Sequence, residues 1–342
     1  MTGRSSAAEV RRGLVLGAGG VLGFAWMVGA LAALEAEEGF DAGAVEVCVG
    51  TSAGSVLAAL LGCGVSVDMM LRHQQGIPIP GDVDLDWDYD RDNGGALPPR
   101  PRLGVGSLDL LRRVARHPTQ VPPLAALSAV LPRGRGTLAP LRRMVDRMSR
   151  SLAAGDGGPP WPTQPQVWVV AMDYGGGQRV TFGRDGAPPS TLAEAVTASC
   201  AIPGWYTPTL IGGRRYVDGG TTSPTSLDLL AGSGLDEVHV LAPMASFAYD
   251  RPHSPVARAE RRLRRTVTRR VLAEASVVRE SGTEVILLGP GPEDLQAMGA
   301  NLMDSRRRPV VLATSLRTSS DALGRILTGS GQPYRRTGSV GG

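Results

Sequence analysis

Short apolar runs alternate with helical patterns along the first part of the chain. An apolar run at residues 13–16 leads into a glycine-rich stretch and a helix predicted from about Val21 to Glu38. A second run at 44–49 leads through a sharp turn into a helix that ends near Gly62, and another helix is predicted over 66–74. Strands and helices in this order form a mainly parallel sheet that is covered by helices. The pattern therefore predicts an α/β fold with a mainly parallel central sheet flanked by helices.

The alternation resumes in the second half of the chain. The hydrophobic run 167–173 predicts a strand, and 179–182 predicts its hairpin partner. Two further apolar runs, 237–241 and 284–288, are expected to extend the same sheet. The remaining predicted elements are strands at 208–211 and 214–217 and helices at 107–116, 123–131, 137–153, 191–199, 292–303 and 308–327. We expect flexible tails at 1–11 and 328–342.

Residues 76–106 interrupt this pattern. Aspartates recur at every second position from Asp82 to Asp92, and a stretch rich in proline and arginine follows. Alternating acids suggest calcium ligands, but the glycine and the terminal glutamate of an EF-hand are absent at the required spacing. We expect a solvated loop that covers the functional site, within a lid or insert at about 76–165. No metal site is predicted.

The composition is that of a globular protein, and it removes several catalytic classes. Of the 342 residues, 42% are hydrophobic, and the mean hydropathy is close to zero. All 36 cationic residues are arginine, so no lysine exists for a Schiff base, a Ser–Lys dyad or a P-loop. The net charge of +4 favours mild attraction to anionic surfaces.

The N-terminal apolar stretch raises the question of a targeting segment. Two arginines precede an uncharged stretch from Leu14 to Leu34, which imitates a signal peptide. The glycines crowded between Gly17 and Gly23 instead predict a strand, a glycine loop and a buried helix. The three cysteines lack CxxC spacing and are expected to be buried thiols, so nothing requires an oxidising compartment. We expect a cytoplasmic protein that can associate peripherally with a membrane.

A glycine–serine turn follows the second apolar run. Gly50-Thr51-Ser52-Ala53-Gly54 has the G-x-S-x-G pattern and lies between a predicted strand and a predicted helix, which is the setting that this motif requires. A serine on such a turn is held out from the backbone, and the N-terminus of the next helix favours developing negative charge. Ser52 is therefore the candidate nucleophile, with Gly50 and Gly54 as the small residues of the turn.

The glycine loop at 17–23 has two interpretations. A dinucleotide-binding loop requires G-x-G-x-x-G, but the position that needs the third glycine is Leu22. Alternatively, Gly19 and Gly20 offer consecutive backbone N–H groups to a substrate oxygen, because no side chain blocks its approach. We favour this oxyanion hole and predict no cofactor.

A third motif, Asp218-Gly219-Gly220, follows the predicted strand at 214–217. Asp-Gly is also an ordinary turn dipeptide. Together with the glycine–serine turn at 50–54, here called the elbow, and the glycine loop, however, it makes the chain resemble the patatin-like phospholipases, whose three motifs occur in this order. The resemblance extends to Ala171-Met172-Asp173, to 198–204 and to Pro224, and it covers roughly residues 12–232.

The resemblance implies a three-layer α/β/α catalytic domain at 12–232, which the strands and helices of 233–327 complete. It also implies a hydrolase of lipid acyl esters with a serine–aspartate dyad and no histidine. Ser52 would be the nucleophile, Asp218 the base and Gly19-Gly20 the oxyanion donors. The supporting motif glycines would be Gly17, Gly23, Gly50, Gly54, Gly219 and Gly220.

The chain departs from the family pattern at three positions. Ala18 stands where the loop usually has glycine, and Leu22 stands where the family often has arginine or lysine. The oxyanion pair survives, but a charge contact to a substrate phosphate is lost, so the substrate is either a phospholipid or a neutral lipid. Ser223 replaces an asparagine that often precedes the proline.

Two other functions remain open. A conventional triad would use Ser52, Asp173 and either His239 or His253, although His239 lies within an apolar strand and His253 stands between prolines. The second open function is that of a lipid-binding or scaffold protein with an inactive hydrolase core.

The stretch 251–270 contains eight arginines, with Leu263, Val267 and Val271 recurring every four residues. This pattern predicts an amphipathic helix, at about 256–281, with a core-facing stripe and a solvated cationic face. Docking on anionic lipid is its functional alternative. Nucleic-acid binding is not predicted, because no motif accompanies the charge.

Overall fold

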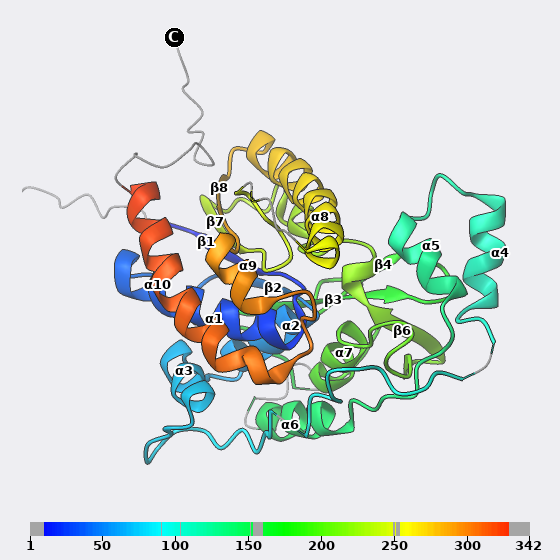
Figure 1. Cartoon of the computed structure of the whole chain (residues 1–342), viewed down its shortest axis with the longest axis horizontal. Coiled ribbons are helices and arrows are strands. Elements are labelled where there is room, and N and C mark those ends of the chain that lie inside the picture. The colour runs from blue at the N-terminus through cyan, green and yellow to red at the C-terminus, as the bar shows by residue number, and fades with distance from the viewer. Residues whose placement is uncertain are drawn as a thin grey trace, which may run out of the picture.

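A mixed eight-stranded sheet forms the centre of the molecule (Figure 1). The structure is a computed structural model that describes residues 10–327, apart from 90, 103, 151, 153–159, 249 and 251–253. The strands are β1 (Arg12–Leu16), β2 (Val47–Thr51), β3 (Gln166–Asp173), β4 (Arg179–Phe182), β5 (Thr209–Ile211), β6 (Arg214–Asp218), β7 (Glu237–Leu241) and β8 (Glu284–Leu288).

Ten α-helices and three short 3-10 helices are described around the sheet. The α-helices are α1 (Gly20–Glu38), α2 (Ala53–Gly62), α3 (Val67–Gln75), α4 (Leu108–Arg116), α5 (Pro123–Val130), α6 (Ala139–Ser149), α7 (Leu192–Ser199), α8 (Pro255–Glu280), α9 (Pro292–Met298) and α10 (Arg308–Leu327). The 3-10 helices are η1 (Gly219–Thr221), η2 (Leu227–Leu230) and η3 (Ser305–Arg307). None of the described helices combines the length and the apolar content that a membrane span requires.

The sheet is mainly parallel, as the sequence predicts. The parallel strands β3, β2, β1, β7 and β8 are neighbours in that order, whereas β4 and β6 pair antiparallel with β3 and β5 pairs antiparallel with β6. Because β7 pairs directly with β1, the C-terminal part of the chain extends the same sheet. The α/β fold class with helices on both faces is confirmed.

The two faces of the sheet are covered by different helices. Leu14 and Leu16 of β1 belong to the core that α1, α2, α7 and α10 complete, whereas Val15 between them faces the opposite core. That second core is closed by the apolar stripe of α8, which includes Val267 and Val271. Figure 1 shows α8 and the pair α1–α10 on opposite sides of the strands. The predicted core-facing stripe of the arginine-rich helix is confirmed for Val267 and Val271 but is wrong for Leu263, which is 46% exposed. The cationic face is not wholly solvated either, because Arg261 and Arg264 are buried.

Strand register brings the end of β2 and the end of β6 together. Antiparallel β4 occupies one edge of β3 from Val169 to Met172, so β2 and β6 share the other edge. On that edge Val170 pairs with Thr51, and the next residue, Ala171, pairs with Asp218. Asp218 therefore lies beside the turn that begins after Thr51.

Three predicted boundaries are wrong. The helix predicted over 137–153 ends at Ser149. The helix predicted over 292–303 ends at Met298, because Gly299 adopts a left-handed φ of 66° and stops it. The strand predicted over 44–49 begins only at Val47, since the amide of Ala44 closes a turn onto the Asp41 carbonyl. Residues after Gly299 are thereby free to approach the site, as Met303 does.

Candidate active site

Ser52 occupies a strained turn between β2 and α2. Its φ of 54° and ψ of −122° are unusual for a residue with a side chain, and such strain persists only where the surroundings fix it. The Ser52 N–H donates to Ser199 Oγ at 2.8 Å. The Ser52 carbonyl accepts from Ser55 Oγ at 2.7 Å and from Cys200 Sγ at 3.3 Å. The predicted elbow therefore forms, and it is fixed from two directions.

The segment Ser199–Ala201 connects the elbow to Asp218. Ser199 Oγ accepts the Ser52 N–H and donates to the Val170 carbonyl at 2.6 Å. Two residues later, the Ala201 carbonyl accepts the Asp218 N–H at 3.0 Å. One short segment thus sets the position of both residues. The sequence resemblance includes this segment, but its contacts become apparent only in the fold.

The Asp218 carboxylate is buried beside Ser52. Its exposed fraction is 6%, and Oδ1 accepts the Gly220 N–H at 2.7 Å. Burial raises the pKa of Asp218 to about 6, although hydrogen bonds from the Ser52 hydroxyl and the Gly220 amide offset part of the rise. Within the described residues, no arginine forms an ion pair with Asp218. The carboxylate therefore has the basicity that a proton acceptor near neutral pH requires.

The glycine loop lies at the N-terminus of α1, next to Ser52. Gly20 has a left-handed φ of 60° and lines the same pocket as Ser52, and Gly19 caps the helix. Among the described residues, the amides of Gly19 and Gly20 have no protein acceptor. Helices α1 and α2 both begin at this point, and the positive charge of their N-terminal ends favours a developing negative charge.

The three motifs meet through backbone contacts that only glycine permits. A side chain at Gly54 would collide with the Leu16 carbonyl and would lie 2.9 Å from the Gly17 carbonyl, so the elbow packs directly on the glycine loop. On the other side, Gly220 lies against Ala18. The predicted motif glycines Gly17, Gly23, Gly50 and Gly219 lie in the same close-packed region. The fold thus brings together every residue that the motifs nominate.

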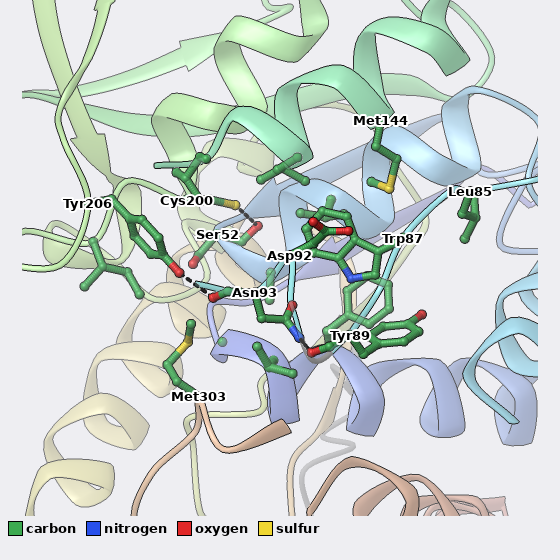
Figure 2. A pocket seen from close by; sticks show the side chains of 18 of the residues that line it. Ser52, Leu85, Trp87, Tyr89, Asp92, Asn93, Met144, Cys200, Tyr206 and Met303 are labelled. Carbon is green, nitrogen blue, oxygen red and sulfur yellow. Dashed lines mark hydrogen bonds between the residues drawn. The ribbon is translucent and has the colours of Figure 1, made fainter. Parts of the chain in front are cut away.

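A deep apolar pocket opens at Ser52 (Figure 2). It contains about 740 Å³ of space between atoms, including its open mouth. Its walls come from α1, α2, α6, the 200–206 segment and the insert, and no arginine of the described residues lines it. Asp218 does not line the pocket, and its carboxylate accepts a hydrogen bond from the Ser52 hydroxyl. Among the apolar residues that line the pocket are Phe24, Leu60, Leu85, Leu141, Met144 and Met303.

Residues 82–89 and 91–93, here called the strap, form one wall of this pocket. Asp84, Asp86 and Asp88 are exposed, as expected for a solvated loop, but Leu85 is buried, and Trp87 and Tyr89 line the pocket with it. Figure 2 shows these three side chains on one side of the cavity. The acids drew attention to the segment, while the apolar residues between them were missed. Their alternation at every second position was the available signal.

Side chains from several elements hold the strap in place. Asp82 and Asp86 pair with Arg72 and Arg147, respectively. The guanidinium of Arg308 lies over the Tyr89 ring, 4.1 Å from its centre. At the far end of the strap, Tyr206 Oη donates to the Asn93 carbonyl at 2.7 Å.

Cys200 opens on the pocket beside Ser52, so the expectation that all three cysteines are buried is wrong. Only Cys48 is fully buried, whereas Cys63 and Cys200 are partly exposed. Desolvation and the Asp218 charge hold the pKa of Cys200 well above its usual value, which keeps it a thiol.

Glu274 of α8 is a functional residue that the sequence did not reveal. It is 3% exposed and holds the loop after Asp218. The Pro224 carbonyl, in the middle of this loop, accepts the Ala18 N–H at 2.8 Å. Glu274 therefore supports the glycine loop indirectly: it holds residues 223–227, and Pro224 within them holds Ala18. The donors to its carboxylate are Ser223 Oγ (2.6 Å), Thr225 Oγ1 (2.8 Å), the Leu227 N–H (3.1 Å) and Arg270 Nε (2.8 Å).

The same helix supports the glycine loop a second time. Buried Arg264 donates to the Pro243 carbonyl at 2.6 Å and pairs with Glu260. The Pro243 ring packs against Gly19 and Gly23. No short sequence spacing links these residues, so local patterns cannot reveal them.

His239, one of the two histidines of the alternative triad, does not reach Ser52. His239 is fully buried in β7, with Nε2 3.1 Å from Glu237 and its ring against Phe40. His239 lies level with Leu14 of β1 and Cys48 of β2, so it is two strands, or roughly 10 Å, away from β2 across the sheet. Because Cys48 precedes Ser52 by four residues, His239 is also displaced by roughly 13 Å along the strands. Asp173 instead pairs with Arg214. His253 lies outside the described residues.

Comparison with known proteins gives one family match. The sequence model of the patatin-like phospholipases matches residues 14–231. A search of the curated proteins finds no match.

Solved structures provide more distant likenesses. VipD from Legionella pneumophila is 14% identical, with a TM-score of 0.39, and the match covers 90% of this chain and 68% of VipD. The type III effector ExoU is 18% identical, with a TM-score of 0.31, and the match covers 93% of this chain and 64% of ExoU. ExoU in its complex with SpcU from Pseudomonas aeruginosa gives 17% identity, a TM-score of 0.29 and coverages of 94% and 60%. This chain thus spans about two thirds of the length of these proteins.

Proposed function

The chain belongs to the patatin-like phospholipase family, and from this premise we propose that it hydrolyses lipid acyl esters with a Ser52–Asp218 dyad. The family supports a lipid hydrolase, and the residue roles are our inference. The observation that supports them best is the buried Asp218 carboxylate, which hydrogen-bonds to Ser52 and has a pKa raised to about 6. A carboxylate with this pKa accepts a proton near neutral pH far better than an exposed aspartate does.

The reaction proceeds in two halves. Ser52 Oγ attacks the acyl carbonyl carbon while its proton passes to Asp218, and the carbonyl oxygen becomes an oxyanion facing the Gly19 and Gly20 amides. The ester C–O bond then breaks, the alcohol leaves with the proton from Asp218, and the acyl group remains on Ser52. Water gives a proton to Asp218 and attacks the acyl–enzyme. The fatty acid departs as the proton returns to Ser52.

The pocket accounts for the acyl part of the substrate. Its lining is almost entirely apolar from Ser52 to Leu60 and Met144, which suits a hydrocarbon chain. Leu22 is buried in the core, so the position where the family often has a cation offers no charge to a phosphate. We propose that the chain selects substrates by the acyl group, with the head group outside the pocket.

Fatty acid release from a mixed lipid extract, followed by mass spectrometry, tests this function. Wild type should release free fatty acids, and Ser52→Ala should release none above background. Ser276→Ala, at an exposed serine of α8, controls for handling and should match wild type. Equal release by wild type and Ser52→Ala would exclude Ser52 as the nucleophile, and no release by either would favour the inactive scaffold.

A further inference from the structure

Helix α5 turns its large apolar side chains toward solvent. Leu124, Leu127 and Val130 are 45%, 53% and 51% exposed, whereas Ala125 and Ala129 are fully buried. An ordinary surface helix places its large apolar residues against the core. The inward side of α5 is instead small enough to pack on Met172 and Tyr174, and Tyr174 Oη donates to the Ser128 carbonyl at 2.7 Å.

Exposed apolar residues of neighbouring segments lie close to this face. The Gly106 N–H donates to the Ala129 carbonyl and the Arg102 N–H to the Arg133 carbonyl, both at 3.0 Å, so residues 102–107 run along the end of α5. Contiguous exposed apolar surface of this kind marks an interaction site. We call it the leucine patch: Val105, Leu108, Leu124, Leu127, Val130 and Leu131. Figure 1 shows α4 and α5 together at one end of the molecule, beyond β4 and β6.

The charge around the leucine patch is strongly positive. From Leu97 to Leu138 the chain contains seven arginines and a single acid, Asp109, which pairs with Arg112. Arg116, on the last turn of α4, is exposed. Apolar side chains surrounded by arginine complement an anionic lipid surface, where the leucines enter the interface and the guanidinium groups contact phosphates.

Contacts connect the leucine patch to a segment that lines the pocket. Leu131 contacts Gly204, and the Gly136 N–H donates to the Trp205 carbonyl at 2.9 Å. The adjoining residues Ile202 and Tyr206 line the pocket. Figure 2 shows Tyr206 close to Ser52. The leucine patch and the pocket are therefore joined by the 202–206 segment.

Helix α8, the other arginine-rich region, has the opposite design. Its stripe of Val267, Val271 and Val278 is buried in the core. Three of its arginines also form ion pairs: Arg261 with Asp250, Arg264 with Glu260 and Arg270 with Glu274. The α4–α5 hairpin instead gathers several exposed large apolar side chains, and its only acid between Leu97 and Leu138 is paired.

We propose that the leucine patch docks this protein on anionic lipid bilayers and presents the pocket mouth to the membrane. The choice of lipid as partner rests on the proposed function. Docking itself does not need Ser52, so the two ideas fail separately.

Cosedimentation of the full chain with vesicles of phosphatidylcholine and phosphatidylglycerol, mixed in equal amounts, tests the proposal. Leu127→Glu should weaken binding at least about tenfold, because it places a charge in the membrane interface. Leu263→Glu, at a similarly exposed leucine of α8, should bind like wild type. Replacing the phosphatidylglycerol or adding salt should weaken wild-type binding. Leu127→Glu should still hydrolyse a soluble short-chain ester at the wild-type rate, which shows that it is folded.

The other outcomes overturn the proposal. Unchanged binding by Leu127→Glu, or an equal loss with Leu263→Glu, would exclude the leucine patch as the docking site. Wild type that fails to bind these vesicles and sediments in the ultracentrifuge as a dimer, which Leu127→Glu converts to a monomer, would identify a second copy as the occupant. Ser52→Ala should bind vesicles normally, so its loss of hydrolysis reports on the proposed function alone.

Discussion

Two buried carboxylates lie at the two ends of the loop that follows β6, and their surroundings differ. Glu274 receives four hydrogen bonds, one of them from the arginine Arg270. Asp218, at the start of the loop, interacts with the Gly220 amide and the Ser52 hydroxyl, and no cation pairs with it among the described residues. Both side chains are nearly inaccessible to water.

The difference separates a structural carboxylate from a chemical one. A buried carboxylate that is fully hydrogen-bonded and paired is stable as an anion and fixes the groups around it. A buried carboxylate with few donors has a raised pKa and takes up a proton readily. Glu274 therefore holds the loop in place, while the raised pKa of Asp218 fits the proton exchange with Ser52 that we propose.

Replacing Asp218 with asparagine should give the largest effect on rate together with a gain in stability. Loss of the base should lower kcat by at least about 10²–10⁴-fold. The raised pKa means that the ionised carboxylate destabilises the native state at pH 8, and that this penalty disappears as pH falls through about 6 toward 3.8. Asparagine removes the penalty, so unfolding in denaturant at pH 8 should require about 1–3 kcal/mol more.

Wild type and Asp218→Asn should therefore converge in stability as the pH is lowered from 8 toward 4. A variant that is less stable than wild type at pH 8, or one that retains full activity, would contradict the role assigned to Asp218.

Replacing Glu274 with alanine should give the largest loss of stability. The change leaves Arg270 unpaired and removes the acceptor for Ser223, Thr225 and the Leu227 amide, at a cost of about 3–5 kcal/mol. Denaturant unfolding measures this loss. Turnover of a soluble ester should also fall, because the Pro224 carbonyl no longer holds the glycine loop in place. Glu280→Ala, at the exposed end of α8, is the control and should change stability by less than about 0.5 kcal/mol.

Ser199→Ala should give a smaller effect on both properties. It leaves the Ser52 amide and the Val170 carbonyl without the Ser199 hydroxyl, which costs about 1–3 kcal/mol. A shift of the nucleophile relative to Asp218 should lower kcat about tenfold with little change in KM. Thr197→Ala removes a hydroxyl that bonds only within α7, and its kcat should not change.

His239→Gln should give the smallest effect. Glutamine can keep a hydrogen bond to Glu237, and His239 lies far from Ser52, so ester hydrolysis should stay within about twofold of wild type. A loss as large as that of Asp218→Asn would restore the triad as the mechanism.

The parts of the site that the sequence predicts are those with local signals. Ser52 and the glycine loop each lie in a short strand–turn–helix pattern, and Asp218 follows a recognisable strand, so their motifs alone nominate them. The register of β3 brings Ser52 and Asp218 close together, but the order of the motifs along the chain was sufficient to predict that they share one site.

The parts that the sequence misses depend on distant packing or on side-chain direction. Glu274 meets Ser223 across 51 positions, and Arg264 reaches Pro243 across 21, without any fixed spacing. The periodicity of α5 predicts a helix correctly, yet it cannot show that alanines face the core and leucines face solvent. Arginine count favoured α8 as the lipid-binding region, whereas the direction of the apolar side chains favours the α4–α5 hairpin.

The central claim is that Ser52 is the nucleophile and Asp218 its base. The rate at which a fluorophosphonate labels the protein, with the adduct mapped by mass spectrometry at each pH, tests both parts at once. We predict a single adduct on Ser52, at a rate that rises about tenfold per pH unit and levels off above about pH 6. An adduct on another residue, or a Ser52 labelling rate that does not change between pH 4 and pH 8, would contradict the account.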